Sequence, residues 1–141
     1  MTITQGATNT FKIGLLDGGY DLATGNFKIA LYTGAASIGP DTTAYTTDGE
    51  VVATGYAAGG EALTISQVPT TGNQSGNATA YLSFSNVTWN AVLTARGALI
   101  YDADSLASVC VLDFGADKTS TSTFTVQFPA ATNTAAIIRI S

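Results

Sequence analysis

The feature of this chain that most constrains its fold is the alternation of apolar and polar residues with a period of two. The alternation is clearest in residues 27–32 and 124–128, where every second residue is Phe, Ile, Leu or Val. Successive side chains of a β-strand point to opposite faces, so this pattern indicates strands with one face in a core. No segment shows sustained helical periodicity, and the sequence therefore predicts an all-β protein.

Weaker versions of the same pattern bring the prediction to about eight short strands. The predicted strands are residues 11–16, 27–32, 63–65, 81–89, 97–101, 108–114, 124–128 and 135–140. Clusters of Gly, Asp, Asn and Ser between them are typical of turns. This organisation predicts a single-domain antiparallel β-sandwich or partly open barrel, jelly-roll or immunoglobulin-like, spanning residues 1–141.

One hydrophobic core is expected to hold these strands together. Its predicted members are Phe27, Ile29, Leu31, Phe84, Leu99, Val111, Phe124, Val126 and Ile138.

Two segments lack a strand pattern and are candidates for an interface. Residues 37–60 form a long predicted loop, and a connection of this length in a compact β domain suggests a function of its own. Its Tyr45 and Tyr56 suit an interface because tyrosine combines a large contact area with a polar tip. The alternative is that both tyrosines hold the loop on its own domain. Residues 1–10 are the second candidate, an N-terminal arm, from which Thr2, Ile3 and Thr4 are predicted to contact a partner.

Charge is sparse, which narrows the choice of partner. The net charge is -5, and charged residues make up 11% of the chain. The basic residues, Lys12, Lys28, Arg96, Lys118 and Arg139, lie singly along the sequence, so no basic stripe is available for nucleic acid. We expect neither a membrane span nor a signal peptide. A weakly charged surface favours burial in an assembly, and the alternative is a threonine-rich monomer.

The residue types that support catalysis or metal binding are also sparse. Histidine is absent, which removes the usual general base and the commonest metal ligand. Cys110 is the only cysteine and is expected in the core. Asp102 and Asp104 begin like a calcium loop, but no Gly or distal Glu follows at the required spacing. We therefore expect no catalytic residue, metal, cofactor or small-molecule substrate.

Three carboxylates and one arginine are further candidates for chemistry. A glycosidase uses a carboxylate pair in a cleft, for which Glu50, Glu61 and Asp113 are the candidates. Arg96 precedes an apolar strand and is expected to pair with Asp102, Asp104 or Asp113 as part of the fold.

A series of short patterns extends over nearly the whole chain. In order they are Phe11-Lys12, Phe27-Lys28-Ile29-Ala30-Leu31-Tyr32-Thr33, residues 42–45, Gly55-Tyr56 before Gly59-Gly60, Trp89, residues 95–101, 109–119, 124–129 and 133–140. On these patterns the chain resembles small virion structural proteins of tailed bacteriophages. It departs from them mainly at residues 72–77 and 102–106.

The resemblance implies a virion component that is assembled in the host bacterial cytoplasm. The function it implies first is that of a capsid decoration, or cement, protein on the outside of the head. Its partners would be the major capsid protein, copies of itself, or both. The alternative in the same class is a tail or fibre component, including a host-binding tip, which exposed aromatic side chains on loops would favour.

Two further classes of protein stay open from the residues alone. A cell-wall or capsule hydrolase would need a pair of carboxylates about 10 Å apart or closer along a cleft. A carbohydrate-binding domain would need a planar row of aromatic side chains, for which Tyr32, Tyr81, Trp89 and Tyr101 are the candidates.

Overall fold

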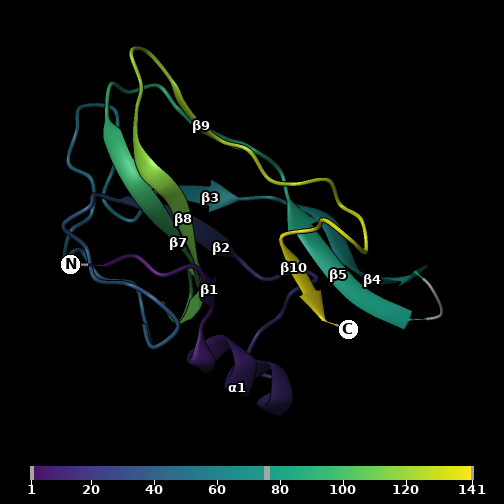
Figure 1. Cartoon of the computed structure of the whole chain (residues 1–141). Coiled ribbons are helices and arrows are strands. Elements are labelled where there is room, and N and C mark those ends of the chain that lie inside the picture. Colours follow the sequence, from purple (N-terminus) through teal and green to yellow (C-terminus); the bar gives the residue numbers. More distant parts are fainter. Residues whose placement is uncertain (1, 75–76, 141) are drawn as a thin grey trace.

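The computed structural model describes residues 2–74 and 77–140 and shows an all-β, sandwich-like fold with a short helix near the N-terminus (Figure 1). The elements are β1 (Gly6–Ala7), α1 (Asn9–Asp17), β2 (Phe27–Tyr32), β3 (Glu61–Leu63), β4 (Ile65–Gln74), β5 (Asn77–Phe84), β6 (Val87–Trp89), β7 (Thr94–Asp102), β8 (Ser108–Thr119), β9 (Phe124–Val126) and β10 (Ile138–Ile140). These strands form a five-stranded sheet in the order β1-β8-β7-β2-β3, a three-stranded sheet β10-β5-β4 and the pair β6-β9. All the strand pairs are antiparallel.

Both faces of the five-stranded sheet are buried at its centre. In the β2–β7 pair Ile29 lies opposite Ile100, and Ala30 lies opposite Leu99. Because successive side chains alternate between faces, the first pair belongs to one hydrophobic cluster and the second pair to another. This explains the continuous buried run at residues 97–101 of β7, which is typical of strands covered on both faces.

The larger cluster fills the space between the five-stranded sheet and the smaller sheets. It includes the predicted core residues Phe27, Ile29, Leu31, Phe84, Phe124 and Val126, and Ile138 packs against it half-buried. Leu99 and Val111 belong instead to the second cluster, which Ile3, Ala36 and Ile38 cover. The prediction of one core was therefore wrong, because it did not foresee that irregular segments cover the second face.

The predicted strand at residues 11–16 was also wrong, since these residues lie in α1. The Thr8 hydroxyl accepts a hydrogen bond from the Phe11 N–H at 3.1 Å and caps the helix, and Gly18 ends it in the left-handed conformation. Phe11 and Gly14 face the core with Leu15 half-buried beside them, which is the spacing of a helix face.

Residues 2–8 lie against the five-stranded sheet and do not form the expected arm. Gly6 and Ala7 pair with Val111 and Cys110 on β8, and Ile3 is buried. Two predicted strands are also divided: residues 81–89 separate into β5 and β6, which belong to different sheets, and Thr64 separates β3 from β4.

Candidate interaction surface

The two segments that the sequence singled out lie side by side. Ile3 and Ile38 form a parallel bridge. The Thr4 N–H donates to the Ile38 carbonyl at 2.9 Å, and the Ile38 N–H donates to the Thr2 carbonyl at 3.1 Å. The N-terminal segment and the first part of the loop between β2 and β3 therefore form one continuous surface.

An open groove of about 540 Å³ follows this junction. It is lined by Thr2, Thr4 and residues 37–44, and Asp41 is the one charged residue among them. The side chains of Thr2, Thr4 and Thr43 are exposed, so their hydroxyls are available as both donors and acceptors. We call this set of residues the threonine groove.

Ile3 positions the groove and does not line it. It points away from its exposed neighbours Thr2 and Thr4, as alternation along an extended chain requires. It packs over Gly97 of β7, where an added Cβ would lie 2.9 Å from the Ile3 side chain. The groove is thus attached to the sheet through buried side chains of the second cluster, Ile3 and Ile38 among them.

The second part of the loop is held by a buried carboxylate. Glu50 is 7% exposed. Its Oε1 accepts hydrogen bonds from the Tyr56 hydroxyl at 2.7 Å and the Gly59 N–H at 2.8 Å, and its Oε2 accepts one from the Tyr45 hydroxyl at 2.6 Å. These donors replace the water that a buried carboxylate loses.

The same tyrosines contact both faces of the five-stranded sheet. Tyr45 stacks on Tyr101 with ring centroids 4.8 Å apart, and the Tyr101 hydroxyl donates to the Gly59 carbonyl at 2.6 Å. Tyr56 packs in the larger cluster beside Trp89, and its hydroxyl accepts from the Leu31 N–H at 2.8 Å. We call Glu50, Tyr45, Tyr56, Gly59 and Tyr101 the Glu50 clamp, because together they fasten the loop around the edge of β2.

The environment of the clamp keeps its phenols protonated. Burial raises the pKa of Tyr45, Tyr56 and Tyr101, and the negative charge of Glu50 raises each of them further. Tyr56 is 9% exposed and Tyr45 is half-buried, so both hold the loop on its own domain, the alternative role considered for them. The exposed part that joins the N-terminal segment to the loop is the threonine groove, and Val52 is exposed elsewhere on the same loop.

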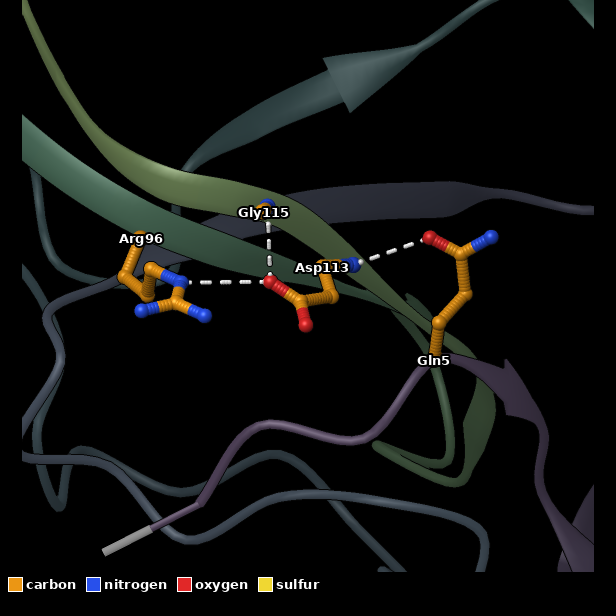
Figure 2. Close-up of polar contacts among 4 residues, drawn as sticks. All are labelled: Gln5, Arg96, Asp113 and Gly115. Carbon is orange, nitrogen blue, oxygen red and sulfur yellow. Dashed lines mark hydrogen bonds and ion pairs between the residues drawn. The ribbon is translucent and has the colours of Figure 1, made fainter.

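Figure 2 shows a second polar cluster, which connects the N-terminal segment to the sheet. Arg96 Nε lies 3.2 Å from Asp113 Oδ1, so of the three carboxylates considered for this arginine Asp113 is the partner. The Gly115 N–H donates to the same oxygen at 2.8 Å, and the Asp113 N–H donates to Gln5 Oε1 at 3.1 Å. The Gly115 N–H first and Arg96 second lower the pKa of Asp113.

The remaining candidates for chemistry have structural environments. Asp102 accepts hydrogen bonds from the N–H groups of Asp104 and Ser105 in its own turn. Glu61 is exposed on β3. Cys110 is buried, and burial raises the pKa of its thiol to about 12, which makes it a poor nucleophile. Within residues 2–74 and 77–140, no three His, Cys, Asp or Glu side chains gather as a metal site would require.

The row of aromatic side chains considered for carbohydrate binding does not form. Tyr32, Trp89 and Tyr101 are all fully or almost fully buried, so they offer no exposed platform. The fourth candidate, Tyr81 on β5, is half-buried and would stand alone, so the four side chains do not support this alternative. The one helix in the described part of the chain is too short to cross a membrane.

Comparison with family models, curated proteins and solved structures finds no match to this chain.

Proposed function

We propose that this protein is a non-enzymatic structural protein of a bacteriophage virion that decorates the capsid by binding the major capsid protein on the outside of the head. The observation that carries the proposal is the threonine groove, in which the N-terminal segment and the loop meet. The resemblance to small phage virion proteins supports a phage particle as the place where the protein acts. The groove is the surface that we propose for contact with the capsid.

The groove has the properties of a contact that depends on shape and hydrogen bonds. Its exposed threonines are short side chains, so ordering them costs less conformational entropy than ordering Lys, Arg or Glu. With Asp41 as its one charge, it has little ionic steering toward a partner. Modest contacts of this kind become strong when a symmetric shell presents many copies together.

The Glu50 clamp supports a structural role for the loop. Both oxygens of Glu50 are bonded to donors of its own domain, which is the arrangement of a carboxylate that stabilises a fold. The clamp fixes the second part of the loop, which continues directly from the groove at Ala44 and Tyr45. A rigid surface loses little entropy on binding.

The position of the loop tyrosines bears on the tail alternative. Exposed aromatic side chains on a loop would favour a host-binding tip. Tyr56 is buried and Tyr45 is half-buried against Tyr101, so this loop offers no such anchor. Capsid decoration is therefore the function that we propose.

The proposal is tested by binding labelled protein to phage heads that lack it. A Thr43→Arg variant places a long cation in the groove and should weaken binding about tenfold or more. Thr121→Arg, which adds the same side chain at an exposed site outside the groove, is the matched control and should bind like the natural protein. Electron microscopy of immunolabelled virions gives the location. Label confined to tails would establish the tail alternative instead.

A further inference from the structure

The outer face of α1 carries two large apolar side chains without a covering element. Ile13 is 63% exposed and Leu16 is 92% exposed, whereas Phe11 and Gly14 on the opposite face are buried. Residues three apart on a helix are neighbours, so Ile13 and Leu16 form one apolar spot. The helix lies at the lower edge of the molecule in Figure 1, outside the sheets.

A cation and an anion flank this spot in a defined order. Lys12 lies beside it toward the N-terminus of α1, and Asp17 is the last residue of the helix. At 3.6 residues per turn, Lys12, Leu16, Ile13 and Asp17 fall in that order within an arc of about 140°. All four side chains are exposed and therefore belong to one surface.

The order of the charges is opposite to the one that the helix itself favours. The helix dipole stabilises anions near the N-terminus and cations near the C-terminus, and α1 has neither. The ion pair in the described part of the chain joins Arg96 to Asp113, so Lys12 and Asp17 are not engaged in one there. This arrangement lowers the stability of the isolated helix, and the Asp17 carboxylate accepts one hydrogen bond, from the Gly19 N–H at 3.0 Å. A partner with the opposite order of charges would offset that cost.

A second copy of α1 supplies that order of charges. If two copies pack antiparallel about a two-fold axis between Gly14 and Leu15, residue positions that sum to 29 lie at the same level. Ile13 then lies level with Leu16 of the second copy, and Lys12 lies level with Asp17 of the second copy. Both apolar contacts and both charge pairs form together, and the reach of the lysine side chain allows it to cross to its partner.

We propose that α1 is a homotypic interface through which two copies of this chain associate, with Ile13 and Leu16 at its centre and Lys12 and Asp17 at its rim. The apolar area is small compared with a standard interface of about 1,600 Å², so the isolated pair is weak and an assembly strengthens it by repetition. Self-association through α1 does not depend on capsid binding. A protein that self-associates but never reaches heads would contradict the capsid role and leave this contact intact.

Sedimentation velocity over a concentration series up to about 1 mM at low salt tests the contact. The natural protein should self-associate. Leu16→Ser should raise the dissociation constant about tenfold or more, because each pair loses two buried leucines. Val52→Ser is the matched control, since Val52 is 97% exposed on the loop between β2 and β3 and should leave association unchanged. A natural protein that stays monomeric at the highest concentration overturns the proposal, as does equal association of the Leu16→Ser variant.

Charge exchange tests the register. Lys12→Glu and Asp17→Lys each place like charges opposite one another and should abolish self-association, while an equimolar mixture of the two variants should associate because their charges are complementary. Lys12→Glu also matches the helix dipole better, so a loss of association cannot come from a weaker helix. High salt should weaken association of the natural protein. A mixture that stays monomeric overturns the antiparallel pairing.

Disulfide formation is a second test of the register between the two antiparallel copies of α1. Under mild oxidation a mixture of Ile13→Cys and Leu16→Cys proteins should cross-link faster than either variant alone, because these positions lie level. The natural protein should not cross-link, since Cys110 is buried. Faster cross-linking within one variant than in the mixture would overturn the two-fold axis proposed here.

Discussion

At the scale of single residues, Glu50 shows how a buried carboxylate is accommodated without an ion pair to any residue that the structure describes. Its hydrogen-bond donors are two phenols and one backbone N–H, all neutral. In a low-dielectric site such bonds are strong, and losing one leaves a polar group unsatisfied at a higher cost than the bond itself contributes. Glu50 is therefore expected to be important for the stability of the loop.

Glu50→Gln should lower the free energy of unfolding by about 1–3 kcal/mol. The amide offers one acceptor oxygen where the carboxylate offers two, so one of the three donors loses its partner. Urea unfolding measures the change. Glu61→Gln, made at an exposed carboxylate on β3, is the matched control and should stay within about 0.5 kcal/mol of the natural protein. Equal stability of both variants would contradict the role given to the clamp.

The tyrosines of the clamp predict how the protein responds to alkali. Their folded pKa values are raised above the ordinary value of 10.0, so the neutral form is the one that the fold favours. The resulting stability is fully present below pH 10 and is lost as the pH rises from 10 toward the folded pKa values. Ultraviolet absorbance of the phenolate should therefore show a fraction of tyrosines that ionises only as the protein unfolds. Ionisation of all tyrosines near pH 10 in the folded state would contradict this.

At the scale of elements, α1 shows why the sequence misled at residues 11–16. The apolar residues there fit a strand as well as a helix, and the segment is too short for periodicity alone to decide. The deciding contact is distant in the sequence. The Ser108 hydroxyl donates to Thr8 Oγ1 at 2.9 Å, and this oxygen also accepts from the Phe11 N–H, so β8 helps to place the cap.

Thr8→Ala should cost about 1–2 kcal/mol in the free energy of unfolding, because the helix loses its cap. Thr8→Ser keeps the hydroxyl and should retain most of that stability. Chemical unfolding of the two variants measures the difference. Equal losses in both would show that the methyl group of Thr8, and not its hydroxyl, is what matters.

The strand predictions were correct where the alternation of apolar and polar residues continued without an intervening turn. Residues 27–32 form β2 as expected, because alternating side chains there face two filled clusters. Residues 81–89 could not be divided correctly, since the break at residues 85–86 depends on which sheet each half joins. Thr64 separates β3 from β4 because these two strands also belong to different sheets, and no local sequence pattern indicates this.

The candidate surface was predictable only in part. The lack of a strand pattern singled out the N-terminal segment and the loop, and the structure brings these together at Ile3 and Ile38. The sequence offered two roles for Tyr45 and Tyr56 and could not decide between them, because both side chains bind Glu50 and the loop has no period from which that shared partner could be inferred.

At the scale of the whole molecule, the second face of the five-stranded sheet is covered by irregular chain. Ile3, Ala36, Ile38 and Tyr45 pack there on residues of β2, β7 and β8, where a conventional sandwich would place another sheet. These irregular segments therefore have two sides. Their buried side completes the second cluster, and their exposed side carries the threonine groove that we propose for binding. Removing residues 1–10 would delete β1 and the helix cap as well, and would not leave the domain intact.

A single substitution, milder than that deletion, tests whether the irregular segments on the second face unfold separately from the larger cluster. Ile3→Ala should cost about 2 kcal/mol or more, because Ile3 is buried in the second cluster. Hydrogen exchange should then be faster at the amides of Thr4 and Ile38, whose bonds join the two segments, than at that of Ile29 within β2. Thr2→Ala, at an exposed neighbouring residue, is the matched control and should leave the exchange rates of the Thr4 and Ile38 amides unchanged. Uniform loss of protection over the whole chain would mean that the irregular segments and the larger cluster unfold as one unit, and that the groove has no independent stability.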